Sequence, residues 1–412
     1  MNHRTPDVTR RTVLRAGLLS GAAVSSSSLL AGCGAGKPEV SSAKGLQIAS
    51  PDNPVKWPIH DDVPMIESGL TPEKGSTLKL YNYADYLSPG VVKDFEKEYG
   101  VNVELSTFND TEEALSKIVS GALNYDIYFP SYDQIGKMVA AKLIRPLNQE
   151  YIPNISNCWP QFEDPWYDQG WQYSVPYTTY TTGIGWRDDM VPEDIGGLDN
   201  PYDALWDAKY RNNMAVIDDW HTCLALPTLR DGSHDVNSED PEVIEGIRTA
   251  MLEMQETTLP KVTVNMYNDL PGGQFGLSQM WSGDIINAVY YLPKKDSPDI
   301  LHYWFPEDGR GLVDNDLMLV LAQGENPVAA HFFLNYLLDA NVSKKNFGYT
   351  GYQPPQRSIN PETLVADGFI PENLKSATVL EEWFDVADRL LGMPLDVEEQ
   401  WLRVWQEFKA GG

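Results

Sequence analysis

The stretch that begins at Leu78 alternates strands with helices, and this alternation constrains the fold more than any other feature of the chain. A short apolar strand begins at Leu78, and further strands are predicted at residues 101–105 and 125–129. Between them, apolar residues recur at helical spacing in two segments that stop at Gly100 and Gly121. This order predicts a mainly parallel sheet with right-handed crossovers. In such sheets, ligands bind beyond the carboxyl ends of the strands.

Two polar loops follow strands at that edge of the predicted sheet. Tyr83, Asp85 and Tyr86 follow the first strand, and Ser131 and Asp133 follow the third. We therefore expect Asp85, Ser131 and Asp133 to lie within reach of one another. Two tyrosine rings beside a carboxylate would suit a small organic cation, because the ring faces attract it and the carboxylate pairs with it. An ordinary polar loop is the alternative.

Carboxylates stand beside aromatic residues at later strand ends as well. Asp219 and Trp220 follow one predicted strand, and Trp281 and Asp284 lie at the turn between another strand and a helix. Together, such pairs would suit ammonium groups joined by methylenes, since rings cover the methylenes and carboxylates hold the amines. Taken singly, each is also explained by core packing or helix capping. Asp219 in particular could cap the helix that follows it.

The motifs of common enzymes are missing from the sequence. There is no GxSxG, P-loop, GxGxxG, HExxH or CxxC motif, and the six histidines are scattered without ligand spacing. We therefore expect no enzymatic activity, no cofactor and no metal site. A secreted carbohydrate-active enzyme remains an alternative, because two catalytic carboxylates pair in space and not in sequence.

The first 32 residues have the order of an export signal. Arg10 and Arg11 form a twin-arginine pair, a weakly apolar run follows, and Leu-Ala-Gly-Cys ends at Cys33, which resembles the lipobox of bacterial lipoproteins. We expect residues 1–32 to be removed and Cys33 to be lipidated. The chain would then lie in the periplasm or at the outer face of the cytoplasmic membrane. Residues 33–76 are rich in proline and predict a tether, which could lie on the surface of the folded chain with Trp57 docked there.

The net charge of the chain limits the partners that it can bind, and its length limits the folds that it can adopt. The formal net charge is −28, and without residues 1–32, which carry a net +3, it becomes −31. Such acidity argues against nucleic acid and against an anionic membrane surface as partners. The remaining length exceeds what one hydrophobic core usually organises, so two lobes are expected. Export would permit a disulfide between Cys158 and Cys223, but the sequence leaves their pairing open.

Over essentially all of residues 78–412, the chain resembles the extracytoplasmic polyamine-binding proteins, the spermidine/putrescine receptors of ABC importers. The matching motifs are LYNYADYLSPGVVKDFEKEYGVNV, YDIYFPSYDQIGKM, YSVPYTTYTTGIGW, ALWDAKYRNNMAVIDD, MWSGD and GYTGYQPP. The resemblance implies an α/β, two-lobed type II periplasmic binding protein fold, with two mainly parallel sheets flanked by helices and a two-crossover hinge. It places lobe 1 at 77–176 and 314–355, and lobe 2 at 177–313 and 356–412.

The resemblance also implies a ligand site. Tyr83 stands where tryptophan is usual and Thr222 where glutamate is usual, and the aromatic residue expected just before Asp314 is absent. The acid on the returning hinge strand falls on Asp314, or on Asn315 if the register slips by one. The implied ligand-binding residues are Tyr83, Asp85, Tyr86, Ser131, Asp133, Asp219, Thr222, Trp281, Asp284, Asp314 and Tyr352.

The function implied by the resemblance is that of a receptor and not of an enzyme. Its two lobes would close on putrescine or spermidine and present the polyamine to the permease subunits of an ABC transporter. We expect a monomer that touches the membrane only through its lipid anchor. A receptor for another cationic or polar solute is the alternative within this class.

Overall fold

The computed structural model describes residues 47–108, 111–121 and 124–411. The predicted twin-arginine pair and Cys33 lie outside the described residues. Within the described part, no helix combines the length and the apolar character needed to cross a membrane.

The described residues form nine strands that share one hydrogen-bonded sheet. The strand order is β2-β1-β3-β9-β4-β7-β5-β6, and β8 pairs with β4. The strands are β1 (Thr77–Tyr83), β2 (Asn102–Phe108), β3 (Ile127–Tyr128), β4 (Ser174–Arg187), β5 (Met214–Ile217), β6 (Lys261–Thr263), β7 (Leu277–Trp281), β8 (Leu301–Trp304) and β9 (Leu312–Val320).

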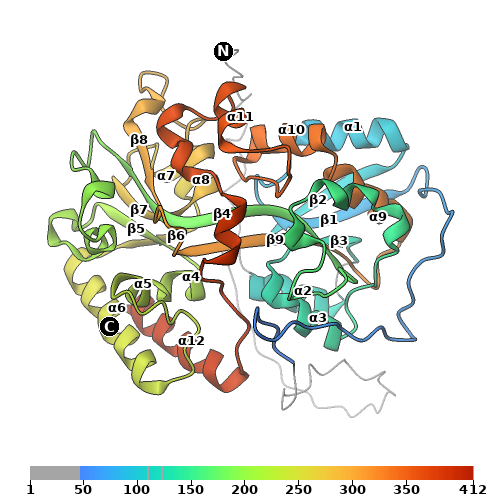
Figure 1. Cartoon of the computed structure of the whole chain (residues 1–412), viewed down its shortest axis with the longest axis horizontal. Helices are drawn as coiled ribbons and strands as arrows, with labels where there is room; N and C mark the ends of the chain where they lie inside the picture. Colours follow the sequence, from blue (N-terminus) through green and yellow to red (C-terminus); the bar gives the residue numbers. More distant parts are fainter. Residues whose placement is uncertain (1–46, 109–110, 122–123, 412) are drawn as a thin grey trace, which may run out of the picture. The chain divides into compact units, whose positions relative to one another are not determined.

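Two long strands join two parallel groups. β1 pairs in parallel with β2 and β3, which we call the first strand group. β5 pairs in parallel with β6 and β7, the second strand group. β4 and β9 run antiparallel to each other and cross from one group to the other (Figure 1). The two expected sheets are therefore continuous through β4 and β9. Strand β4 runs through Tyr177 with an irregular register between Pro176 and Thr178.

Helices flank both strand groups. Figure 1 shows α1, α2 and α9 beside the first group and α5, α6 and α12 beside the second. The bounds are α1 (Pro89–Tyr99), α2 (Thr111–Ser120), α3 (Ile135–Ala140), α4 (Trp220–Leu224), α5 (Leu226–Arg230), α6 (Pro241–Thr258), α7 (Met266–Asp269), α8 (Ser282–Ala288), α9 (Pro327–Leu337), α10 (Ala340–Thr350), α11 (Pro361–Ala366) and α12 (Leu395–Ala410).

Local sequence explains where several of these helices begin and end. Pro89 opens α1, and Gly100 ends it in the left-handed conformation at φ 69°, which glycine adopts without steric cost. Helix α4 begins at Trp220, directly after Asp219, whose side chain accepts a hydrogen bond from a backbone N–H of the first turn. Asp219 is therefore a helix cap, as the alternative interpretation held.

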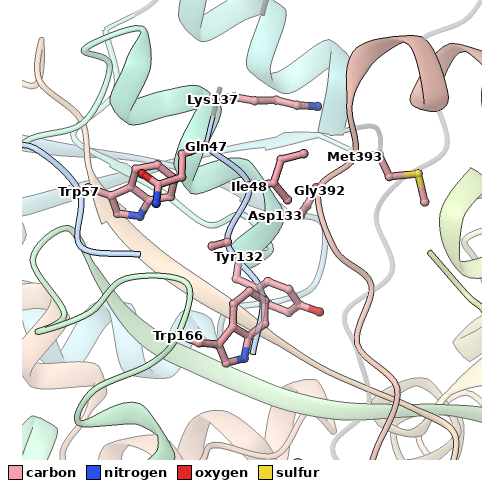
Figure 2. Close-up of a pocket in the computed structure, with 11 residues that line it drawn as sticks. Gln47, Ile48, Trp57, Tyr132, Asp133, Lys137, Trp166, Gly392 and Met393 are labelled. Atoms are coloured by element: carbon pink, nitrogen blue, oxygen red, sulfur yellow. The ribbon is translucent and has the colours of Figure 1, made fainter. Parts of the chain in front are cut away.

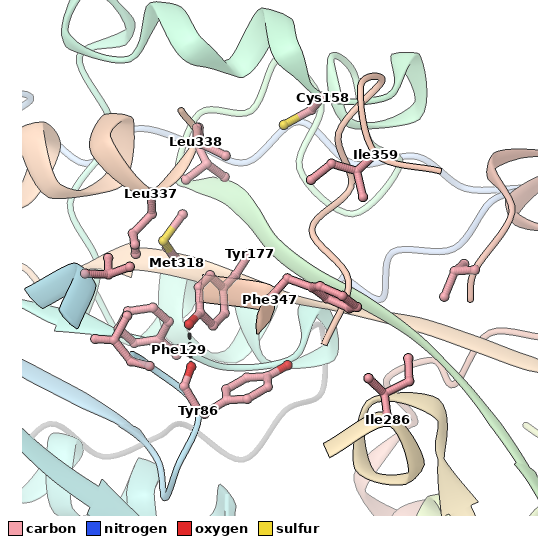
Figure 3. Packing of buried hydrophobic residues seen from close by; sticks show 14 of the residues in the cluster. Tyr86, Phe129, Cys158, Tyr177, Ile286, Met318, Leu337, Leu338, Phe347 and Ile359 are labelled. Atoms are coloured by element: carbon pink, nitrogen blue, oxygen red, sulfur yellow. Dashed lines mark hydrogen bonds between the residues drawn. The ribbon is translucent and has the colours of Figure 1, made fainter. Parts of the chain in front are cut away.

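Three clusters of buried apolar side chains support the sheet. The largest takes side chains from both strand groups, and Figure 3 shows Tyr177 of β4 within it, next to Phe129 and Met318. The Tyr177 hydroxyl donates a hydrogen bond to the backbone carbonyl of Tyr86, so this cluster also fixes the loop after β1. The second cluster lies around Trp401 of α12, and the third packs against β1 and β3.

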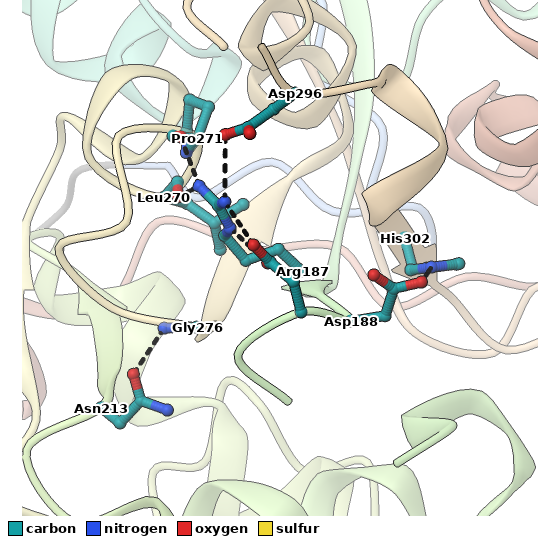
Figure 4. A network of polar contacts seen from close by, with 9 residues as sticks. Arg187, Asp188, Asn213, Leu270, Pro271, Gly276, Asp296 and His302 are labelled. Carbon is teal, nitrogen blue, oxygen red and sulfur yellow. Dashed lines mark hydrogen bonds and ion pairs between the residues drawn. The ribbon is translucent and has the colours of Figure 1, made fainter. Parts of the chain in front are cut away.

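The end of β4 that lies beside the second strand group is fixed by an arginine. Arg187 is 5% exposed and pairs through two nitrogens with Asp189, at 2.7 and 2.8 Å. It also lies 3.4 Å from Asp296 and donates to the carbonyl of Pro271 (Figure 4). Because a buried guanidinium requires counter-charges and acceptors, this arginine ties β4 to the loops that follow α7 and α8.

Trp57 anchors the tether to the rest of the described chain. Trp57 is buried and donates a hydrogen bond from Nε1 to the carbonyl of Tyr167 at 2.7 Å, so the expected docking of this residue is confirmed. Val55 is buried beside it.

Cys158 and Cys223 are both buried and free, and they belong to different clusters. They therefore form no disulfide in this structure.

Candidate functional site

A carboxylate at the start of α8 faces a tyrosine from a distant segment. Asp284 is 4% exposed, and its Oδ1 accepts a hydrogen bond from the Tyr352 hydroxyl at 2.8 Å. A Cβ on Gly283 would lie 2.3 Å from the Tyr352 ring, so only glycine permits this approach. The MWSGD and GYTGYQPP motifs therefore pack directly on each other. Asp284 Oδ2 is buried and has no hydrogen-bond partner among the described residues.

A second buried carboxylate lies on β9. Asp316 is 6% exposed and accepts hydrogen bonds from Tyr86 at 2.8 Å and from Tyr180 at 3.3 Å. Both donors are neutral hydroxyls. Tyr86 comes from the loop after β1 and Tyr180 from β4, so the carboxylate lies where the first strand group meets the two crossing strands.

Aromatic rings connect these two carboxylates. Tyr352, which binds Asp284, packs edge to face against Tyr86 at 4.7 Å and against Tyr180 at 5.8 Å between ring centroids. Trp281 extends the group by an edge contact with Tyr180 at 6.3 Å, and Tyr83 does so by one with Tyr86 at 5.7 Å. The rings form a continuous aromatic wall between the carboxylates.

Burial dominates the electrostatics of both carboxylates. It raises the pKa of Asp284 to about 7, against a partial lowering by the Tyr352 hydroxyl. It raises the pKa of Asp316 to about 7 as well, and the neighbouring carboxylates of Asp314 and Asp133 add to that rise. Neither carboxylate forms an ion pair with a lysine, arginine or histidine of the described residues, and no cation is among the main causes of either shift in pKa. Two buried acids without a counter-charge, set among aromatic rings, suit a cationic ligand.

The predicted acid Asp314 has a different environment. It is 5% exposed, accepts a hydrogen bond from the Tyr132 hydroxyl at 2.5 Å, and lies 3.6 Å from Nε of Arg389. Asn315, the alternative register, accepts a hydrogen bond from the same arginine at 2.6 Å. Burial raises the pKa of Asp314, and the Arg389 guanidinium opposes that rise. This acid therefore already faces a cation of the protein.

Two further predicted acids are satisfied by local hydrogen bonds. Ser131 donates to one oxygen of Asp133 and Gln134 to the other, both at 2.6 Å. Asp219 caps α4 by accepting from the backbone N–H of Thr222 at 2.8 Å, and Thr222 is buried. Both carboxylates nevertheless act on the pKa of Tyr83, so they lie within electrostatic range of the aromatic wall.

Asp85 lies farther out than its position in the motif suggests. It is exposed, adopts a left-handed backbone at φ 56°, and accepts long hydrogen bonds of 3.4 Å from Tyr267 and Tyr349. Tyr267 belongs to α7 and Tyr349 to α10. Asp85 therefore links the loop after β1 to elements on either side of the site, at its exposed rim.

Asp133 also lines a small cavity, which is separate from the candidate site around Asp284 and Asp316. It measures about 30 Å³, enough for one or two water molecules and too small for an organic solute. Figure 2 shows Gln47 and Trp57 of the tether on one side of it and Met393 on the other. Within the described residues, no group of three or more histidine, cysteine, aspartate or glutamate side chains could hold a metal ion.

The structure thus gathers five of the eleven predicted residues in one place and adds two that sequence reasoning missed. Tyr83, Tyr86, Trp281, Asp284 and Tyr352 meet at the aromatic wall, and their role in binding stays a prediction. Tyr180 and Asp316 were not predicted. The available signal was the alternation of β9, because Asp314 and Asp316 are two positions apart and share one face of the strand.

Comparison with known proteins identifies the family. The family model described as bacterial extracellular solute-binding protein matches residues 90–372, more than half of the chain. A Salmonella typhimurium protein named spermidine/putrescine-binding periplasmic protein is 26% identical over 304 residues, which cover 72% of this chain and 83% of that protein. A putrescine/agmatine-binding protein of Pseudomonas aeruginosa is 25% identical over 82% of this chain and 92% of its own length.

Solved structures agree on the fold. The crystal structure of a spermidine/putrescine ABC transporter substrate-binding protein from Streptococcus pneumoniae superposes with a TM-score of 0.66 and 25% identity, covering 82% of this chain and 99% of that chain. The structural neighbours are type II periplasmic binding proteins, so the predicted fold class is confirmed.

Proposed function

Since the chain belongs to the family of bacterial extracellular solute-binding proteins, we propose that it captures a polyamine, putrescine or spermidine, and delivers it to the permease subunits of an ABC transporter. The observation that carries this proposal is the pair of buried carboxylates, Asp284 and Asp316, which face no cation of the described residues and flank an aromatic wall. The names of the relatives support the choice of a polyamine.

The binding site lies between two lobes in this proposal. Lobe 1 comprises 77–176 and 314–355, and lobe 2 comprises 177–313 and 356–412. Asp316 would then come from lobe 1 and Asp284 from lobe 2, so a diamine bound to both carboxylates would hold the lobes together. Movement at Tyr177, Val313 and Tyr352 would open the site. The irregular register beside Tyr177 supports a hinge at that position.

Catalysis plays no part in the proposed function. The buried carboxylates face tyrosine hydroxyls and rings, and their role is to hold charge. A receptor for another cationic solute is the second candidate within the class. Isothermal titration of the ligand-depleted protein with putrescine, spermidine, amino acids and sugars tests both candidates. Micromolar or tighter binding of a polyamine is the expected result, and binding of sugars alone would contradict the proposal.

The protein would act as an exported, lipid-anchored monomer. The twin-arginine pair and the cysteine of the lipobox support this part of the proposal. Replacement Cys33→Ala should release the protein from the membrane fraction or leave the precursor uncleaved. An unchanged membrane fraction in that variant would contradict the anchor.

A further inference from the structure

A buried arginine lies directly beside the candidate site. Arg389 is 7% exposed, and its guanidinium lies over the rings of Tyr132 at 4.6 Å, Phe384 at 4.9 Å and Trp166 at 5.8 Å. It comes from the segment before α12, far along the chain from the other residues of the site. An aromatic enclosure of this kind is a favourable environment for a cation.

The same arginine faces the polar groups of β9. Its Nε lies 3.6 Å from Asp314, and its Nη2 donates to Asn315 at 2.6 Å. Tyr132, over whose ring the guanidinium lies, also donates its hydroxyl to Asp314. Arg389 therefore has the two kinds of partner, a carboxylate and aromatic rings, that a bound ammonium group would need.

The carboxylate that Arg389 pairs with, Asp314, lies two positions along β9 from Asp316. Asp314 pairs across the crossing strands with Tyr180, and Asp316 pairs with Thr178. Two positions along a strand are separated by about 7 Å and point to the same face. Asp316 accepts a hydrogen bond from the Tyr180 hydroxyl, and Asp314 acts on the pKa of Asp316. A ligand that reaches Asp316 therefore ends next to the Asp314–Arg389 pair.

We propose that Arg389 determines specificity: it supplies the cation beside Asp314 itself, so that the site accepts a ligand with two ammonium groups, held at Asp284 and Asp316, and rejects a third. This inference rests on the proposed function and narrows its substrate class to diamines. A third ammonium would meet the guanidinium, and a juxtaposed like charge disfavours the wrong ligand.

The test compares putrescine with spermidine by isothermal titration at fixed salt. In the wild type we expect putrescine to bind on the order of tenfold more tightly, or more. In Arg389→Gln, Asp314 becomes free to accept an ammonium, so the spermidine affinity should rise relative to putrescine by on the order of tenfold. The matched control is Arg187→Gln, which removes another buried, carboxylate-paired arginine away from the site and should leave the ratio unchanged.

A second variant covers the case in which Arg389→Gln fails to fold. The double replacement Arg389→Gln with Asp314→Asn removes both charges together, so no buried charge is left unpaired. Its ratio should also move toward spermidine, because the repulsion is gone, but by less than in the single variant. An unchanged ratio in the variants that fold, or an equal change in Arg187→Gln, would overturn the inference and leave the proposed function standing.

Two other outcomes are informative. 4-Aminobutyrate has the four-carbon chain of putrescine with one terminal aminomethyl group replaced by a carboxylate, and we expect it to bind far more weakly than putrescine. Equal binding that is lost in Arg389→Gln would assign the arginine to an anion and overturn the inference. Absence of binding of both amines to the wild type would contradict the proposed function itself, and the inference with it.

Discussion

Three carboxylates are equally buried in the middle of this molecule, yet they divide into two kinds. Asp314 faces the Arg389 guanidinium and the Tyr132 hydroxyl. Asp284 and Asp316 face hydroxyls and rings alone among the described residues, and burial raises the pKa of each to about 7. The comparison teaches that burial by itself does not mark a binding acid. What distinguishes such an acid is that the protein leaves its charge uncompensated.

The two kinds of carboxylate place opposite demands on the fold. Burying a charge without a partner costs free energy, so Asp284 and Asp316 destabilise the ligand-free protein when they are ionised. Breaking a buried pair is costly in a different way, because the remaining partner is left uncompensated. We therefore expect substitution of Asp314 to act mainly on stability, and substitution of Asp284 mainly on affinity.

The largest expected effect is the loss of stability on breaking the buried pair. Asp314→Asn leaves the Arg389 guanidinium without its counter-charge and should lower the free energy of unfolding by about 3–5 kcal/mol. Urea denaturation of the ligand-free protein measures this change. Asp284→Asn serves as the control, because it removes an unpaired charge and should not lower the stability. Equal losses in the two variants would erase the distinction between the two kinds of carboxylate.

The second effect is on affinity. Asp284→Asn leaves one ammonium of the bound diamine without its counter-charge, at a cost of about 2–5 kcal/mol, or roughly 30-fold to several thousand-fold in Kd. Titration calorimetry with putrescine measures it. Glu253→Gln, on the exposed surface of α6, is the control and should bind like the wild type. Unchanged affinity in a folded Asp284→Asn variant would remove α8 from the site.

The sequence predicts the position of a site residue when its neighbours in the chain determine that position. It does not do so when distant segments determine it. Asp284 is predictable, because a strand, a turn and a helix within one short motif set its position. The docking of Trp57 is predictable for a different reason, because an isolated tryptophan in a proline-rich tether has a large apolar surface to bury. The mainly parallel α/β sheet also follows from local patterns, since the strand and helix order that begins at Leu78 appears directly in the sequence, whereas the two-lobed fold class was implied by the family resemblance.

The two acids on β9 show where local reasoning ends. Asp314 and Asp316 have the same residue type and share one face of β9, so no local signal separates them. They differ because Arg389 arrives from a distant segment and pairs with Asp314. The role of Asp219 was left open for a related reason: a helix cap and a ligand contact require the same residue at the same position. Long-range packing decides both cases.

The third effect is a dependence of stability and affinity on pH. It tests the comparison between the two kinds of carboxylate, because stability and affinity should change in opposite directions. Asp284 and Asp316 have pKa values of about 7 in the folded protein against 3.8 for ordinary aspartate. The folded chain therefore holds protons that the unfolded chain loses, and the ligand-free stability should fall as pH rises from about 4 to 7. A bound cation requires the ionised acids, so affinity should rise over the same range.

The size of that pH effect follows from the protonation equilibrium. Below pH 7, each carboxylate can weaken binding by up to about tenfold per pH unit, equivalent to about 1.4 kcal/mol. Titrations with putrescine between pH 5.5 and 8 measure the slope, and Asp284→Asn should make it shallower. An affinity independent of pH in the wild type would mean that both acids are already ionised without the ligand.

The smallest expected effect distinguishes the contribution of the aromatic rings to affinity from that of the carboxylates. Trp281 is half-buried beside Tyr180, so its loss in Trp281→Ala should weaken putrescine binding by about 0.5–1 kcal/mol through lost cation–π contact, roughly two- to fivefold in Kd. Trp281→Phe keeps a ring face and should retain most of the affinity. Because the tryptophan carries no titrating group, the pH slope should stay that of the wild type in both variants. A shallower slope in Trp281→Ala would show that the ring acts by burying Asp284, and the aromatic wall would then be part of the electrostatic site.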